Sequence, residues 1–125
     1  MLSLNFVLLY VEDPAASGDF YAGLLARAPV HAEETFVMFV FDNGLRLGLW
    51  ARSAAAPGLP TPAGASEVAF EVKADADVDA LCTQWWERGV KVIEPPSEKD
   101  FGRTFLAADP DGHRLRVFAP SAPRP

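Results

Sequence analysis

Aromatic and arginine side chains near the ends of strand-like segments are the residues of this sequence whose spacing suggests ligand binding. Trp50 closes the alternating segment 45–51, and Arg46 and Gly48 share its face because side chains alternate along a strand. A glycine two residues from an indole leaves room for a flat ligand to lie against the ring. Either Trp50 stacks on such a ligand, or its ring serves ordinary packing or a contact between subunits.

A second group of candidate residues is ionic. Glu67 and Arg116 are expected at neighbouring positions of one sheet face, where they form a salt bridge or contact the polar edge of a ligand. Arg46, Arg103 and Arg114 can each attract a ligand carboxylate, or serve as solvated or structural arginines. Arg103 ranks first among these three because of its position in the segment FGRTF.

The other reactive side chains have ordinary explanations. Asp109 and Asp111 belong to an Asp-Pro-Asp-Gly turn, and their carboxylates are expected to cap the backbone of that turn. Cys82 is a buried small hydrophobe by its helical spacing, with no neighbouring base in the sequence to activate it. His31 and Glu33 share a face of a short strand, which supplies two ligands and at best a weak metal site. We predict no catalytic residue among them.

The first half of the chain predicts a strand, a helix and three further strands. Asp13-Pro14 is typical of a helix start, because aspartate caps a helix and proline fits its first turn. Asn43-Gly44 is typical of a tight hairpin turn. The predicted strands are 4–12, 30–33, 36–41 and 45–51, and the predicted helix runs from Asp13 to about Arg27.

The same order of elements follows a segment rich in Ala, Pro and Gly. It comprises strand 67–73, a helix that Asp75 or Asp77 caps and Gly89 ends, strand 90–94, and hairpin strands 101–107 and 113–119. The two halves align at a separation of about 61 residues. The predicted fold class is α+β, with two βαβββ modules in one domain, 1–125: module 1 at about 1–52, a linker at 53–65 and module 2 at about 66–120.

A helix covers one face of each curved mixed sheet, and we expect the two uncovered faces to enclose a cavity. Alternation along the strands assigns side chains to these faces. The uncovered faces are predicted to carry Phe6, Leu8, Tyr10, Arg46, Gly48 and Trp50 in module 1, and Glu67, Ala69, Glu71, Arg114, Arg116 and Phe118 in module 2. Phe6 and Tyr10 are expected to line the cavity as apolar wall.

Composition narrows the class of partner. The chain has 125 residues, with seventeen acids against eleven bases, so its surface is expected to repel nucleic acid and anionic lipid. No apolar run approaches the roughly 18 residues of a membrane span. One cysteine and the absence of a signal-like opening favour a cytoplasmic location. A small molecule or a protein is the expected partner.

The paired βαβββ modules, the strand-Asp-Pro-helix opening that ends in FYAGLL, and the closing segment DPDGHRLRVF resemble the vicinal oxygen chelate superfamily. This superfamily contains glyoxalases, extradiol dioxygenases, fosfomycin-inactivating enzymes and bleomycin-binding proteins. Four stretches, LLYV, GLW, SEV and FGRTFLAADPDGHRLRVF, resemble more closely its metal-free phenazine-antibiotic resistance proteins. By this resemblance, the four positions that hold a divalent metal in the enzymes fall here on Phe6, Gly48, Glu67 and Arg116. We interpret the metal site as lost.

The resemblance implies metal-independent binding and sequestration of a planar aromatic molecule, with no cofactor and no bond made. It also implies a homodimer with pockets at the subunit boundary, Trp50 as a stacking residue, and the strand that begins Phe101-Gly102-Arg103 as pocket wall. The alternative is a metal-dependent lyase, isomerase or dioxygenase, in which Glu67 and other residues hold the ion. A scaffold or regulatory subunit with a vestigial pocket is a third possibility.

Overall fold

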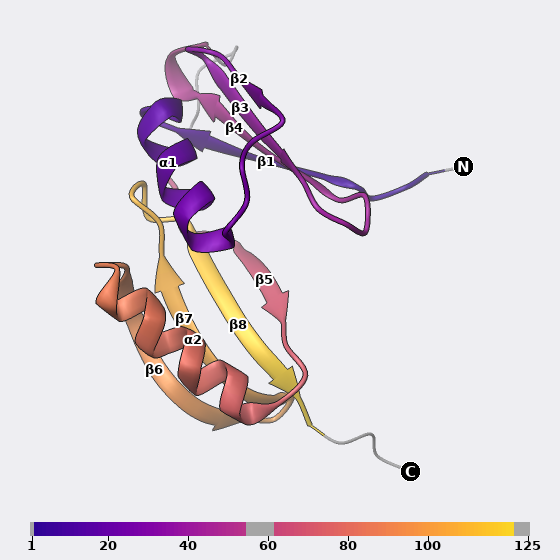
Figure 1. Cartoon of the computed structure of the whole chain (residues 1–125), viewed down its shortest axis with the longest axis vertical. Coiled ribbons are helices and arrows are strands. Elements are labelled where there is room, and N and C mark those ends of the chain that lie inside the picture. The colour runs from indigo at the N-terminus through magenta and orange to yellow at the C-terminus, as the bar shows by residue number, and fades with distance from the viewer. Residues whose placement is uncertain (1, 55–61, 122–125) are drawn as a thin grey trace. The chain divides into compact units, whose positions relative to one another are not determined.

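The computed structural model describes residues 2–54 and 62–121, which form two compact units, Met1–Pro62 and Ala63–Pro125. Each unit is one four-stranded sheet with one helix packed on it (Figure 1). The division falls in the segment predicted as a linker, most of which, 55–61, lies outside the described residues. Within the described residues, no helix is both long enough and apolar enough to cross a membrane.

The first unit has the strand order β1-β4-β3-β2, with β1 parallel to β4 and the other neighbours antiparallel. Its elements are β1 (Phe6–Val11), α1 (Pro14–Leu25), β2 (His31–Ala32), β3 (Phe36–Val40), β4 (Arg46–Ala51) and a 3-10 turn η1 (Arg52–Ala54). Asp13 caps α1 as predicted, because its carboxylate accepts hydrogen bonds from the backbone of the first helical turn. The Asn43 side chain likewise accepts from the Leu45 N–H and supports the β3–β4 turn.

The second unit repeats this topology, with the order β5-β8-β7-β6 and β5 parallel to β8. Its elements are β5 (Glu67–Glu71), α2 (Asp75–Glu87), β6 (Lys91–Lys99), β7 (Gly102–Ala108) and β8 (Arg114–Pro120). The predicted α+β fold of two βαβββ modules is therefore confirmed. In Figure 1, α2 lies along one face of its own sheet and leaves the other face uncovered.

Trp85 anchors the core of the second unit, as its helical spacing predicts. It is 4% exposed and meets the rings of Phe70 and Phe105 edge-on, at centroid distances of 6.3 and 5.1 Å. These edge-on contacts are favourable arrangements of aromatic rings. The indole fixes the position of α2 against β5 and β7, and thereby decides which sheet face stays open.

Two local predictions for this unit are wrong. The predicted strand 90–94 instead continues to Lys99 through Pro95 and Pro96, which is possible because β6 is an edge strand with a row of N–H groups that no neighbour needs. The N-cap of α2 is Ala74 rather than an aspartate. The Asp77 carboxylate instead accepts a hydrogen bond from the Ala74 N–H at 3.2 Å, within the first turn.

The closing hairpin turn behaves as its sequence predicts. One oxygen of Asp109 accepts hydrogen bonds from the N–H groups of Asp111 and His113, at 2.9 and 2.8 Å. Gly112 has a φ of 95°, in the region that favours glycine. This turn sets the register between β7 and β8 and so the positions of the side chains on the open face.

Candidate functional site

Strand alternation sorts the first sheet as predicted. Leu9 and Leu49 are buried on the side that α1 covers, whereas Leu8, on the other side, is 46% exposed. The strand pairing also places Phe36 and Met38 of β3 on this open side, directly across from Trp50 and Gly48. We call the open side the aromatic face; it carries Phe6, Leu8, Tyr10, Phe36, Met38, Arg46 and Trp50.

Trp50 contacts a second aromatic ring on this face. The Tyr10 and Trp50 ring centroids are 5.8 Å apart, and the ring planes are inclined by 32°. At the other end of the same two strands, the Arg46 guanidinium lies 5.6 Å from the centre of the Phe6 ring. The structure therefore places four of the predicted site residues on one face, as two pairs at opposite ends of β1 and β4: Phe6 with Arg46, and Tyr10 with Trp50.

Gly48 does not provide the open space that its position next to Trp50 suggests. A Cβ atom built on Gly48 would lie 2.8 Å from Leu8 Cδ2 and 2.9 Å from Phe36 Cε1, so these side chains already cover its backbone. A flat ligand on this face would consequently contact Leu8 and Phe36. Phe36 was not among the residues predicted for the open face, although the alternation of the segment Phe36–Val40 beside β4 indicates it.

The open face of the second sheet is ionic instead. Arg116 donates two hydrogen bonds to Glu67, from Nε to Oε1 at 2.6 Å and from Nη2 to Oε2 at 3.0 Å. Its Nη1 donates to the Thr104 hydroxyl oxygen at 3.1 Å. These hydrogen bonds from Arg116 hold the pKa of the Glu67 carboxyl below its usual range, despite partial burial. The predicted salt bridge between Glu67 and Arg116 is confirmed.

Two phenylalanines extend this ionic face. The Arg116 guanidinium lies 5.8 Å from the centre of the Phe101 ring, and the Phe101 and Phe118 rings meet edge-on at 5.9 Å. Phe101 remains 46% exposed. Thr104, which the sequence did not single out, is fully buried, and its hydroxyl donates to the Val117 carbonyl at 2.7 Å. We call the group of Glu67, Phe101, Thr104, Arg116 and Phe118 the ionic face.

Arg103 does not belong to either face. Its Nε donates to Asp79 of α2 at 2.8 Å, and its Nη1 donates to Glu98 of β6 at 3.2 Å. It follows Gly102 in β7 and precedes Thr104, so alternation directs it to the side that α2 covers. Arg103, which the sequence ranked first among the arginines for a ligand carboxylate, is thus held by Asp79 and Glu98 on the α2 side and does not share the open face with Arg116.

The four positions where the superfamily's enzymes hold a metal do not fit a divalent cation here. Phe6 and Gly48 offer no side-chain donor atom, and both carboxylate oxygens of Glu67 accept hydrogen bonds from Arg116. A guanidinium at the fourth position would repel a cation. In residues 2–54 and 62–121, no three or more His, Cys, Asp or Glu side chains gather in a metal-binding arrangement. We therefore assign no reaction step to a metal.

Comparison with known proteins agrees with this architecture. The profile of the Glyoxalase/Bleomycin resistance protein/Dioxygenase superfamily matches residues 3–117. The chain belongs to this superfamily. It is similar to the phenazine antibiotic resistance protein EhpR of Enterobacter agglomerans, with 33% identity over 116 residues that cover 90% of this chain and 88% of EhpR.

Solved structures give the same result. A protein of Agrobacterium tumefaciens, determined in solution by NMR, is 44% identical and has a TM-score of 0.90, covering 98% of this chain and all of its own. A glyoxalase-related enzyme of Fulvimarina pelagi is 22% identical with a TM-score of 0.84, covering 95% of this chain and 88% of its own. At that identity the likeness shows the fold alone.

Proposed function

We propose that this protein binds and sequesters a planar aromatic small molecule of the phenazine type, without a metal and without changing any of its bonds. The observation that carries the proposal is the pair of Tyr10 and Trp50 on the aromatic face, at a ring distance of 5.8 Å. The similarity of the chain to a phenazine antibiotic resistance protein, over 90% of its length, supports this ligand class.

The geometry of the pair suits stacking. Trp50 is half-buried at the end of β4, so packing fixes its indole while part of the ring remains accessible. Leu8 and Phe36 supply apolar surface beside it, over Gly48. A flat tricyclic ligand that covers this surface removes apolar area from water on both sides of the contact.

Arg46 is the residue best placed to select a ligand with a carboxylate. It is exposed at the edge of the aromatic face, above Phe6, and no acidic partner pairs with it among the residues that the structure describes. Arg103 and Arg116, by contrast, each already donate two hydrogen bonds to carboxylates. An arginine without a carboxylate partner can offer a bidentate contact to the ligand.

A scale for the affinity follows from ligand size. Phenazine-1-carboxylate has about 17 heavy atoms, and at roughly 0.4 kcal/mol per atom its binding free energy is about 7 kcal/mol, or a Kd of roughly 10 µM. Binding of this strength removes a toxin from solution only when the protein is abundant.

We also propose that the protein forms a homodimer. Leu8 lies 46% exposed on the aromatic face, and a second copy that covers this apolar surface would remove it from water. Light scattering after gel filtration measures its mass.

Equilibrium dialysis of chelator-treated protein against phenazine-1-carboxylate tests the proposal, with the absorbance of the ligand as readout. We expect saturable uptake, and about fivefold weaker binding by the Trp50→Phe variant, since the smaller ring loses part of the stacking area. The matched control is Trp86→Phe, because Trp86 lies exposed on α2, on the opposite side of its own sheet from the ionic face. No saturable uptake, or equal loss in both variants, would contradict the proposal.

A further inference from the structure

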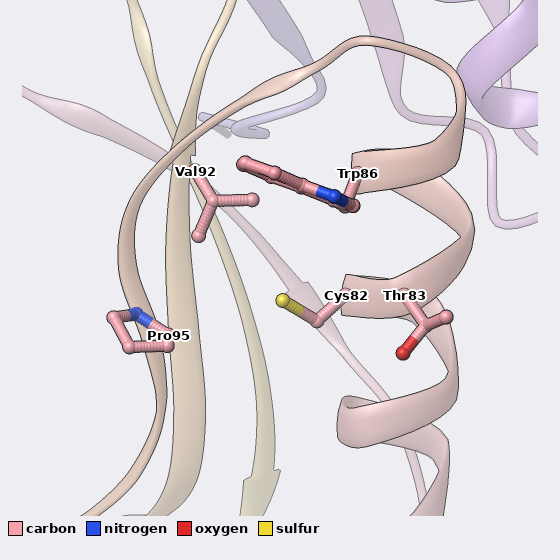
Figure 2. A pocket seen from close by; sticks show the side chains of 5 residues that line it. All are labelled: Cys82, Thr83, Trp86, Val92 and Pro95. Carbon is pink, nitrogen blue, oxygen red and sulfur yellow. The ribbon is translucent and has the colours of Figure 1, made fainter.

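The polar groups that can select a ligand differ between two surfaces of the molecule. A cavity of about 390 Å³ lies between α2 and β6, lined by Cys82, Thr83, Trp86, Val92 and Pro95 (Figure 2). No charged side chain lines it, and the Thr83 hydroxyl already donates to the Asp79 carbonyl oxygen at 3.2 Å. Its lining therefore selects no particular ligand. The β2 edge of the aromatic face, by contrast, carries polar atoms in defined positions.

The edge strand β2 adds one residue to the aromatic face. His31 pairs with Met38 of β3, and Met38 pairs in turn with Gly48, so these three residues face the same side of the sheet. Ala32, the next residue, instead lines a small cavity on the α1 side. The His31 and Phe36 ring centroids are 5.9 Å apart, and the ring planes are inclined by 53°. His31 therefore extends the aromatic face by one strand beyond Phe36.

Glu33 fixes the chemical state of this histidine. The Glu33 N–H donates to the Phe36 carbonyl at 2.8 Å, and Glu33 Oε1 lies 3.2 Å from His31 Nε2. A carboxylate only accepts hydrogen bonds, so this contact favours the neutral tautomer with its proton on Nε2. In residues 2–54 and 62–121, no group forms a hydrogen bond with the other ring nitrogen, Nδ1. Nδ1 of the neutral ring is therefore an available acceptor.

The charges around His31 agree with an acceptor at this edge. Glu33 and Glu34 are exposed carboxylates, and β3, the strand beside them, contributes no charged side chain. Among the described residues, neither Arg46 of β4 nor Arg52 of η1 forms an ion pair with these glutamates. A ligand group at the β2 edge thus meets hydrogen-bond acceptors, whereas Arg46, two strands away, offers donors.

The width of the face suits a tricyclic ligand. Trp50 of β4 pairs with Phe36 of β3, and β2 is the next strand. Neighbouring strands lie about 4.8 Å apart, so β4 and β2 are separated by about 10 Å. Three fused rings that stack on Trp50 and extend over Phe36 reach across this separation. An outer ring of the ligand consequently comes next to His31.

We propose that His31 and Glu33 select a ligand that carries a hydroxyl or amino group on the ring away from its carboxylate. This selection rests on the function proposed above. Arg46 contacts the carboxylate, and His31 Nδ1 accepts a hydrogen bond from the O–H or N–H group. Glu33 is a positioning residue, because it holds the histidine proton on Nε2. The preferred ligand class is a planar tricyclic acid with a hydrogen-bond donor at its opposite end.

Equilibrium dialysis with two matched ligands tests this selection. The ligands are 7-hydroxyphenazine-1-carboxylate and its 7-methoxy analogue, which has no O–H to donate. At pH 7 the wild type should bind the hydroxy compound about threefold more tightly, an effect typical of one exposed hydrogen bond. His31→Phe keeps an aromatic ring but removes both nitrogens. It should lose this preference and leave the affinity for the methoxy compound unchanged.

The pH dependence of the preference is a second readout. A histidine gains its second ring proton as the pH falls from about 8 to about 5, and Nδ1 then becomes a donor. Both compounds offer an oxygen that accepts from it, so the preference of the wild type should fall below about 1.5-fold at pH 5. Glu33→Gln should reduce the preference at pH 7 about twofold, because the amide no longer fixes the tautomer.

His113→Phe is the matched control, because His113 is the other of the two histidines and lies in the closing turn of the second unit. It should retain the preference and its pH dependence. The inference is overturned if the wild type binds both compounds equally, if His31→Phe keeps the preference, or if His113→Phe loses it. Equal binding of both compounds leaves the proposed sequestration intact, whereas the absence of saturable binding of either compound contradicts both proposals.

Discussion

The two sheets share their strand order and the parallel pairing of first and fourth strands, but they carry different side chains on their open faces. The first strand of each unit begins opposite an arginine of the fourth, with Phe6 paired to Arg46 and Glu67 paired to Arg114. Two residues further along, the pairs are Leu8 with Gly48 in the first sheet and Ala69 with Arg116 in the second. The large and small residues have exchanged strands.

This exchange explains why one face is aromatic and the other ionic. Leu8 reaches across to cover Gly48, which gives continuous apolar surface beside Trp50. Ala69 leaves the space beside β8 free, so Arg116 lies flat and reaches Glu67 with two hydrogen bonds. The residues at this cross-strand pair thus contribute to the apolar surface of the first face and leave room for the Glu67–Arg116 ion pair on the second.

The largest expected effect is the difference between substitutions at two glycines of positive φ, one in each unit. Gly102 of the second sheet has a φ of +139°, and a Cβ there would overlap the Ala119 carbonyl oxygen. Gly102→Ala should therefore destabilise the protein by about 3 kcal/mol. Gly44 of the first sheet has a φ of +88° with open space around it, so Gly44→Ala should cost only about 1 kcal/mol. Urea unfolding followed by circular dichroism measures the loss of unfolding free energy in each variant. Equal losses would contradict the expectation that only the Gly102 position is sterically blocked.

A second substitution tests the pair of Leu8 and Gly48, which contributes to the apolar surface of the aromatic face. Gly48→Ala should destabilise the protein by about 1 kcal/mol, because the new methyl group collides with Leu8 and Phe36. In a Leu8→Ala background the same change should cost less than half as much, since one of the two obstructing side chains is gone. A double-mutant cycle in urea measures this coupling. Additive effects of the two substitutions would show that Leu8 does not cover Gly48.

The third prediction breaks the ion pair of the second face. Glu67→Gln should cost about 1 kcal/mol, a value typical of a partly exposed, bidentate pair. The metal-dependent alternative expects this variant to lose a bound ion and an activity, whereas our account expects phenazine uptake to persist. Glu71→Gln, on the same strand, is the matched control and should be neutral.

The pH dependence of stability sharpens the same test. The folded-state pKa of Glu67 is depressed, chiefly by the hydrogen bonds from Arg116, so its contribution is present above the unfolded pKa. That contribution is lost as the pH falls through the lower, folded-state pKa. The difference in unfolding free energy between wild type and Glu67→Gln should begin to shrink as the pH falls below the ordinary glutamate pKa of about 4.3, and should vanish only below the lower folded-state pKa. A constant difference from pH 7 to pH 3 would argue against the pair.

The smallest expected effects are the changes in ligand affinity on substituting Arg103 and Arg46. Arg103 lies on the α2 side with Asp79 and Glu98, so Arg103→Gln should change phenazine-1-carboxylate affinity by less than about twofold. Arg46→Gln, at the edge of the aromatic face, should weaken it about threefold, and less at high salt. Equilibrium dialysis compares the two variants. A larger loss in Arg103→Gln would place the ligand elsewhere.

Local signals in the sequence were sufficient for most of the fold. Asp13-Pro14 starts α1, Asn43-Gly44 turns the first hairpin, and the period-two pattern of 45–51 assigns Trp50 to the open side. Each signal depends on a few adjacent residues and on backbone geometry that those residues dictate. The same alternation placed Glu67 and Arg116 close enough to pair.

What the sequence could not give depends on contacts between distant residues. Arg103 pairs with Asp79 of α2, which lies 24 residues earlier in the chain. The position of Arg103 in the segment FGRTF does not reveal that contact. The space over Gly48 is filled from two other strands, by Leu8 and Phe36. In the sequence, Pro95 indicates the end of a strand. Only the position of β6 at the edge of its sheet explains why the strand continues through this proline.

We propose that a planar aromatic ligand binds through Trp50 without a metal. The most direct test is isothermal titration calorimetry of chelator-treated protein with phenazine-1-carboxylate, repeated after addition of Zn²⁺ or Mn²⁺ and with Trp50→Ala. We predict a Kd of roughly 10 µM that changes by less than about twofold with metal, and about tenfold weaker binding in the variant. Binding that requires the metal, or that Trp50→Ala leaves unchanged, would contradict the account.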